Sequence, residues 1–306
     1  MKNLTGAEPA HQARSIAGVA LIIAAYFFIN PLASAIYGFI ATSLNLTIVS
    51  GNTIHLLPFG VVGAVRLILD FFLVVLVYKT LNRKFRGFPL LGPHMLKMAV
   101  SGLAIGMAVM SGAILAIIAT GNASVSVSPQ PFTDTVRNAS GWLAFEGLAA
   151  LGEELLVRVA VLVVAERFAG WRGALIASGL MFAALHLDNP GATGIWLTRL
   201  LCQGVLLAYA VYRTGSFWWS VGYHTGWNWA SAPIFGASGS GYYVDGHVLT
   251  FTPGDAHWIT GGAVGPEGSV FAFVAVLAGF LLLVATTPNR RMPPRNSLTT
   301  PDAHTA

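Results

Sequence analysis

The chain has 306 residues, of which 55% are hydrophobic and only 9% charged, and its formal net charge is +5. Soluble domains carry roughly 25% charged residues, so this composition excludes a protein whose whole surface faces water. The basic residues are scattered at the ends of apolar blocks, which argues against nucleic acid as a partner. The single cysteine, Cys202, excludes an internal disulfide and any cysteine-based metal site.

Apolar blocks long enough to cross a lipid bilayer recur along the chain. A hydrocarbon core of about 30 Å requires roughly 20 apolar residues per helix. The predicted spans, in chain order, are residues 16–41, 59–78, 98–120, 141–165, 174–187, 195–212, 217–235 and 269–286. We therefore expect an all-α fold, a polytopic membrane bundle of about eight transmembrane helices.

The spans leave room for one membrane domain, residues 16–287, between an N-terminal segment, residues 1–15, and a tail, residues 288–306. The tail is rich in Pro and Thr, and we expect it to be disordered. Lys and Arg follow every second span, whereas the alternate loops contain only Arg137. By the positive-inside rule, both termini are then cytoplasmic. The short loops indicate a bacterial plasma membrane.

On this topology the loop of residues 236–268 is external. It contains no Lys or Arg and is rich in Gly, Tyr and Trp. Two placements are open: the loop lies at the membrane interface, or it folds back over the bundle.

Charged side chains inside the fourth span are the first sign of a functional site. Such charges are costly in a membrane, so each one is a functional hypothesis by default. Glu153 and Glu154 are adjacent, and Arg158 follows Glu154 by four residues, on the same helix face. We predict that Glu154 pairs with Arg158, while Glu153 points into a polar cavity that Glu146 also lines. The alternative is an ion-paired triad with a purely structural role.

Polar residues in later spans complete the candidate site. His186 lies in the fifth span, and His224 and Asn228 share one face of the seventh. Each alone is compatible with simple helix-packing hydrogen bonds. Together with Glu153, however, the two histidines match a catalytic zinc site, with three protein ligands and an open position for water. Counted at 1.5 Å per residue, Glu153, His186 and His224 lie at overlapping depths of about 18, 19 and 11 Å.

Three further charges lie inside predicted spans. Arg66 and Asp70 are four residues apart in the second span, and we expect them to pair with each other. Arg199 in the sixth span requires an acidic partner on a neighbouring helix, for which Glu153 and Glu146 are the candidates.

Three motifs, in this order, resemble those of the CPBP intramembrane proteases, which comprise CAAX prenyl proteases and bacteriocin-processing or immunity proteins. The motifs are Glu-Glu-x-x-x-Arg at residues 153–158, Phe-x-x-x-His at residues 182–186 and His-x-x-x-Asn at residues 224–228. The resemblance covers roughly residues 140–235, and the stretch at residues 260–269 is also similar to bacterial members. Three motifs in order on predicted membrane helices are fairly specific.

The resemblance implies about eight helices around a conical, water-accessible cavity in which a peptide or protein substrate is cleaved. The catalytic residues that it implies are Glu153, Glu154, His186, His224 and Asn228, supported by Arg158 and Phe182. In this scheme Glu153 and His186 activate the attacking water. His224 and Asn228 stabilise the oxyanion or hold the metal, and Arg158 anchors Glu154. The three motifs contain no departure from the family pattern.

Two mechanisms fit these residues. In the first, Glu153, His186 and His224 hold zinc, which lowers the pKa of bound water to about 7 and polarises the carbonyl. In the second, Glu153 and His186 deprotonate water directly, and Asn228 donates to the oxyanion. We expect zinc as the cofactor. The alternative functions are a non-catalytic immunity or peptide-binding protein and, with less support because no internal repeat is present, a transporter.

Overall fold

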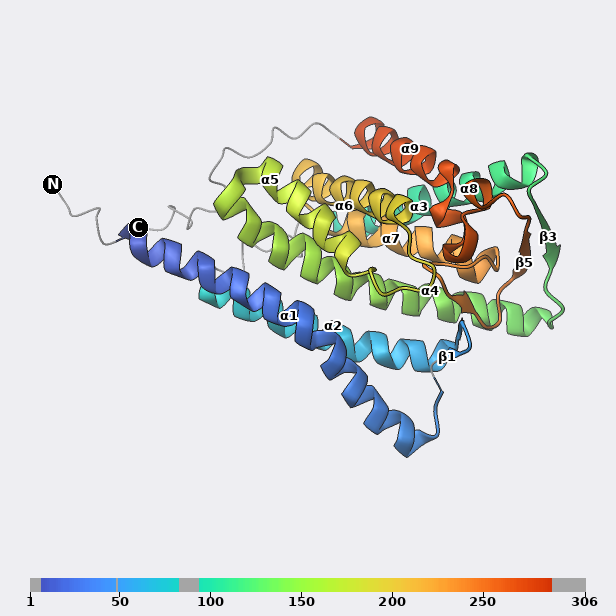
Figure 1. Ribbon diagram of the computed structural model, residues 1–306, viewed down its shortest axis with the longest axis horizontal. Helices are drawn as coiled ribbons and strands as arrows, with labels where there is room; N and C mark the ends of the chain where they lie inside the picture. The colour runs from blue at the N-terminus through green and yellow to red at the C-terminus, as the bar shows by residue number, and fades with distance from the viewer. Residues whose placement is uncertain (1–6, 48, 83–93, 288–306) are drawn as a thin grey trace.

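The computed structural model describes residues 7–47, 49–82 and 94–287, which form a bundle of long helices (Figure 1). The N-terminal residues 1–6 and the predicted disordered tail, residues 288–306, lie outside the described residues. The main helices are α1 (Ala7–Leu44), α2 (Leu56–Thr80), α3 (Met95–Ala119), α4 (Phe132–Glu154), α5 (Leu162–Ala184), α6 (Gly194–Thr214), α7 (Trp218–Trp229) and α9 (Val270–Thr286). The all-α bundle predicted from the sequence is confirmed.

Four helices in the described part of the chain are long and apolar enough to cross a membrane: residues Gln12–Leu44, Leu56–Thr80, Met95–Ala119 and Gly194–Thr214. A shorter apolar helix covers Val270–Thr286. The remaining predicted spans also coincide with helices, but these carry the charged and polar residues of the candidate site. Helices of this length and hydropathy make the chain an integral membrane protein.

The fourth and fifth predicted spans are joined without a separate loop. A π-helical segment, η4 (Leu155–Val161), connects α4 to α5 directly. The chain then bends inside α5 at Gly170, whose φ of 64° lies in the left-handed region that glycine adopts most readily. After this bend α5 runs back along the bundle (Figure 1).

Short strands gather at one end of the bundle, on the right in Figure 1. The hairpin of β1 (Val49–Ser50) and β2 (Thr53–Ile54) pairs through β2 with β4 (Tyr243–Val244), which runs parallel to it. A second antiparallel pair joins β3 (Ala123–Val127) to β5 (Leu249–Pro253). The strands thus connect three loops that are far apart in the sequence.

The loop of residues 236–268 folds back over the bundle, which is one of the two placements left open by the sequence. It contains β4, β5, a short helix α8 (His257–Thr260) and the 3-10 turns η6 (Gly262–Val264) and η7 (Pro266–Gly268). Its residues Ala237, Phe251 and Val264 are buried in the hydrophobic core. The loop is therefore part of the packed structure.

Helices α3 and α7 are in backbone contact through facing pairs of glycines. Gly102 and Gly106 lie four residues apart on α3, and Gly222 and Gly226 do so on α7. A Cβ atom added at Gly106 would lie 2.1 Å from the backbone oxygen of Tyr223. Small residues with this spacing allow close packing of membrane helices, and here they fix α7, which carries two candidate site residues.

Candidate active site

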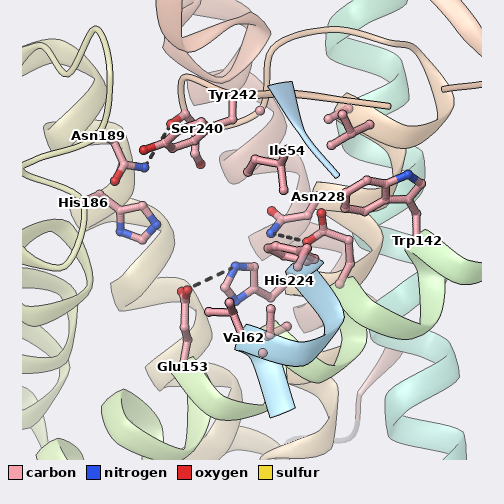
Figure 2. A pocket seen from close by; sticks show the side chains of 18 of the residues that line it. Ile54, Val62, Trp142, Glu153, His186, Asn189, His224, Asn228, Ser240 and Tyr242 are labelled. Carbon is pink, nitrogen blue, oxygen red and sulfur yellow. Dashed lines mark hydrogen bonds and ion pairs between the residues drawn. The ribbon is translucent and has the colours of Figure 1, made fainter. Parts of the chain in front are cut away.

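A cavity of about 240 Å³ lies among α2, α4, α7, the end of α5 and the loop of residues 236–268 (Figure 2). Five polar residues singled out in the sequence contribute to its lining: Glu146, Glu153, His186, His224 and Asn228. The structure therefore brings together side chains from the three helices that carry the motifs, and it places Glu146 and Glu153 in one cavity as expected.

Glu153 lies between a cation and an imidazole. Its Oε1 atom is 3.5 Å from Nη1 of Arg66. Its Oε2 atom is 4.0 Å from Nε2 of His224 (Figure 2). The Arg66 side chain is also 3.6 Å from Asp70, which confirms that predicted pair. Only 17% of the Glu153 side chain is exposed, so its charge depends on these neighbours rather than on bulk water.

Glu154 does not line the cavity; it lies behind it, with its side chain fully buried. One oxygen is 3.0 Å from Nε of Arg158, which confirms the predicted ion pair. The other accepts a hydrogen bond of 3.0 Å from Nδ1 of His224. Glu154 therefore fixes the His224 ring so that the opposite nitrogen, Nε2, is the one directed toward Glu153.

The four-residue spacing of the second motif allows the backbone of Phe182 to bind the ring of His186. The backbone oxygen of Phe182 accepts a hydrogen bond of 2.8 Å from Nδ1 of His186, four residues later. Its ring lies 4.5 Å from the guanidinium of Arg158 and makes edge contacts with both His186 and His224. Because Nδ1 of His186 carries the proton in this bond, Nε2 of the neutral ring is free to accept one.

The side chain of Asn228 on α7 is held in place by a carboxylate on α4. Its Nδ2 atom donates a hydrogen bond of 3.2 Å to Oε2 of Glu146, which is itself buried. An amide nitrogen carries two protons, so one N–H of Asn228 remains after this bond is made. Asn228 and His224 lie one turn apart on α7, and both side chains line the cavity.

The expected partner of Arg199 was wrong. Its guanidinium pairs with Glu267, at 3.1 Å, instead of with Glu153 or Glu146. Glu267 belongs to the 3-10 turn η7 and lines the cavity; its carboxylate also accepts hydrogen bonds from Trp227 and Ser240. The sequence offered one signal for this residue, because the stretch at residues 260–269 resembles bacterial members of the protease family.

Other lining residues were not identified from the sequence as part of the site. They include Arg66, Trp142, Asn189, Ser240 and Tyr242. Arg66 alone gave a signal, as a charge within a predicted span, but no motif connected it to the site. Trp142 lies in the middle of α4, and the other three come from loops whose positions no periodicity specifies.

The zinc site expected from the residue types stays a prediction. Across the described ranges, no group of three or more His, Cys, Asp or Glu side chains is close enough to hold a metal ion. Nδ1 of His186 is used by Phe182 and Nδ1 of His224 by Glu154, so Nε2 of each ring is the nitrogen that could bind a metal. The described donors do not gather around one point, so the side chains as placed do not fit a metal, and the chemistry below is derived from this chain's own groups.

A carboxylate, two imidazoles and a carboxamide thus line one cavity inside the helical bundle of a membrane protein. Residues 136–230 match a family model described as type II CAAX prenyl endopeptidase Rce1-like. The match covers about a third of the chain and contains all three motifs. This match confirms the family resemblance and indicates a membrane protease. No curated protein and no solved structure gives a significant match.

Proposed function

We propose that the protein is an intramembrane endopeptidase that hydrolyses a peptide bond in the cavity of Figure 2. The observation that carries the proposal is that Glu153, His186, His224 and Asn228 line one cavity, although they come from three separate parts of the chain. A purely structural set of polar side chains would satisfy one another completely. Here, Nε2 of His186 and one N–H of Asn228 remain for a substrate.

The nucleophile in this proposal is a water molecule between Glu153 and His186. The Glu153 carboxylate accepts a proton from the water as it attacks the scissile carbonyl, and His186 Nε2 accepts its second hydrogen bond. Glu153 then returns the proton to the leaving amine, so this one residue acts first as the general base and then as the general acid. Arg66 holds Glu153 in place during this cycle through the 3.5 Å contact.

The negative charge on the carbonyl oxygen requires donors that are already oriented. The remaining N–H of Asn228 and, in its protonated form, Nε2–H of His224 are the candidates, since Glu146 and Glu154 fix the two side chains from behind. Fixed donors of this kind cost no reorganisation when charge develops. Glu154, Arg158 and Phe182 act as positioning residues in this proposal because none of them lines the cavity.

The cellular setting is part of the same proposal. The substrate is a peptide segment of another protein that reaches the bilayer, and the enzyme resides in a bacterial plasma membrane with both termini in the cytoplasm. The loop charges support this orientation, since Arg137 is the one basic residue in the loops predicted to be external.

The substitution Glu153→Gln tests the general base. We expect cleavage of a synthetic peptide mixture by the purified protein, followed by mass spectrometry, to fall at least about 100-fold, because loss of a general base removes that much. Thermal unfolding in detergent should change little. Asp134→Asn is the matched control, since it removes a carboxylate from the same helix outside the cavity. Retained activity of Glu153→Gln would reject the assignment.

Metal analysis tests the choice between the two mechanisms. Because the described donors do not gather around one point, we expect full activity at sub-stoichiometric metal and no inhibition by chelators. The measurements are elemental analysis of the active protein and cleavage before and after dialysis against a chelator. Activity that disappears with the metal and returns with added zinc would establish the zinc mechanism instead.

A further inference from the structure

The cavity occupies one end of the bundle. On α2, its lining residues run from Phe59 to Arg66, and the helix then continues to Thr80, about 21 Å further at 1.5 Å per residue. No residue of α5 itself lines the cavity; Leu185 and His186, which follow directly after the end of that helix at Ala184, do. Both lining segments lie toward the end of the molecule that carries the β-strands.

The rim at this end is made of loops and strand ends. Six lining residues belong to such segments: Ile54, Asn189, Gly239, Ser240, Tyr242 and Val244. Figure 2 places the labelled members of this set on the side of the cavity opposite Glu153. Two contacts connect the rim segments. Asn189 Nδ2 donates a hydrogen bond of 2.9 Å to the backbone oxygen of Ser240, and His55 Nδ1 lies 2.9 Å from Oδ2 of Asp245.

Beyond Glu153 the interior is filled by protein. All seven residues of η4, which follows directly after Glu154, are buried. Five of them, Leu155, Leu156, Val157, Val159 and Ala160, pack in one hydrophobic cluster with residues of the second half of α2, including Leu73, Val77 and Tyr78. A substrate therefore reaches Glu153 through the loop end of the molecule, because dense packing blocks the opposite end.

The two ends also differ in charge. The closed end carries the basic residues at the starts and ends of helices: Arg14, Lys79, Lys97, Arg167, Arg172 and Arg213. At the open end, Arg137 is the one such residue in the described ranges, and it is accompanied by Asp134, Asp188, Asp245 and Asp255. By the positive-inside rule, the closed end faces the cytoplasm.

Building on the proposed protease function, we infer that the cavity receives its peptide from the non-cytoplasmic side of the membrane. The substrate class is then an extended segment of an exported or membrane-anchored protein, at a point that lies outside the cytoplasm. The packed half of the bundle lies between Glu153 and the cytoplasmic end.

Cysteine labelling tests the side on which the cavity opens and requires no activity. In a Cys202→Ser background, a membrane-impermeant maleimide added to intact cells should label Tyr242→Cys at the rim but not Lys79→Cys at the closed end. Permeabilisation should then expose Lys79→Cys. Asp255→Cys, exposed at the rim end, replaces Tyr242→Cys if that variant does not fold. The reverse labelling pattern would overturn the inference.

Cleavage in oriented membranes tests substrate entry. A synthetic peptide mixture should be cleaved when added to right-side-out vesicles, and cleavage in sealed inverted vesicles should be at least about tenfold slower. Cleavage mainly in inverted vesicles would overturn the inference. If neither preparation nor the detergent-solubilised protein cleaves, the protease proposal fails, while the labelling pattern still decides which side the cavity faces.

Discussion

Phe182 shows how a single residue organises much of the candidate site. Its backbone oxygen fixes the proton of His186 on Nδ1, and its ring packs against Arg158 and His224. A smaller side chain would keep the backbone bond but lose the three ring contacts. The aromatic residue of the second motif thus connects the other two motifs physically, although it contacts no substrate in our proposal.

Arg66 belongs to no motif, yet it is the cation nearest to Glu153 among the described ion pairs. We predict that Arg66→Ala lowers kcat/KM at least about tenfold, because a catalytic group displaced by even 1 Å loses much of its effect. The measurement is cleavage of the peptide mixture. Added guanidinium should partly restore the activity, since it can occupy the vacated position beside Glu153.

Two variants control this prediction. Arg66→Ala leaves Asp70 buried without its partner, so the double variant with Asp70→Asn separates lost activity from lost stability. Arg137→Ala removes an exposed arginine at the open end and should leave cleavage unchanged. Full activity of the double variant, or no response to guanidinium, would remove Arg66 from the site.

At the scale of elements, the sequence predicted most of what apolar length and helical spacing determine. The spans, the Glu154–Arg158 pair and the shared face of His224 and Asn228 all follow from one repeating geometry. The sequence did not predict the places where the backbone departs from regular α-helical geometry. The π turns η4 and η5 (Ala230–Ile234) follow the site residues of α4 and α7 closely, and no residue pattern specified them.

The packing of α3 on α7 makes a testable prediction about the glycines. Gly106→Ala should destabilise the protein by about 1–3 kcal/mol, because the added methyl group would overlap the α7 backbone and force the helices apart. Thermal unfolding of the purified protein in detergent measures this. Cleavage should fall together with stability, since α7 carries His224 and Asn228.

Gly112→Ala is the matched control on the same helix. A Cβ at this position has no neighbouring atom within 4 Å, so the substitution should be neutral or slightly stabilising. Equal unfolding temperatures for the two alanine variants would show that the close contact between α3 and α7 contributes nothing to stability.

At the scale of the whole molecule, the loop of residues 236–268 completes the cavity wall. Hydropathy alone identifies this segment as a loop between two membrane helices, because it contains no apolar stretch long enough to span the membrane. The structure places Glu267 of this loop in the bundle, where it pairs with Arg199 of α6 and accepts a hydrogen bond from Trp227 of α7. Contacts of this kind depend on three-dimensional proximity, so no local pattern could predict them.

We predict that the Arg199–Glu267 pair holds the loop on the bundle. Glu267→Gln keeps the shape of the side chain but leaves the Arg199 charge buried and unpaired, which costs about 3–5 kcal/mol. We expect a lower unfolding temperature in detergent, together with faster maleimide labelling of a cysteine at position 242. Replacing both residues, as Arg199→Met with Glu267→Met, should recover part of the lost stability, because no charge then remains unpaired. Asp134→Asn, which breaks an exposed pair with Arg137, should change neither measurement. If Glu267→Gln behaves like Asp134→Asn, the loop is held by its apolar contacts alone, and the cavity wall does not depend on this ion pair.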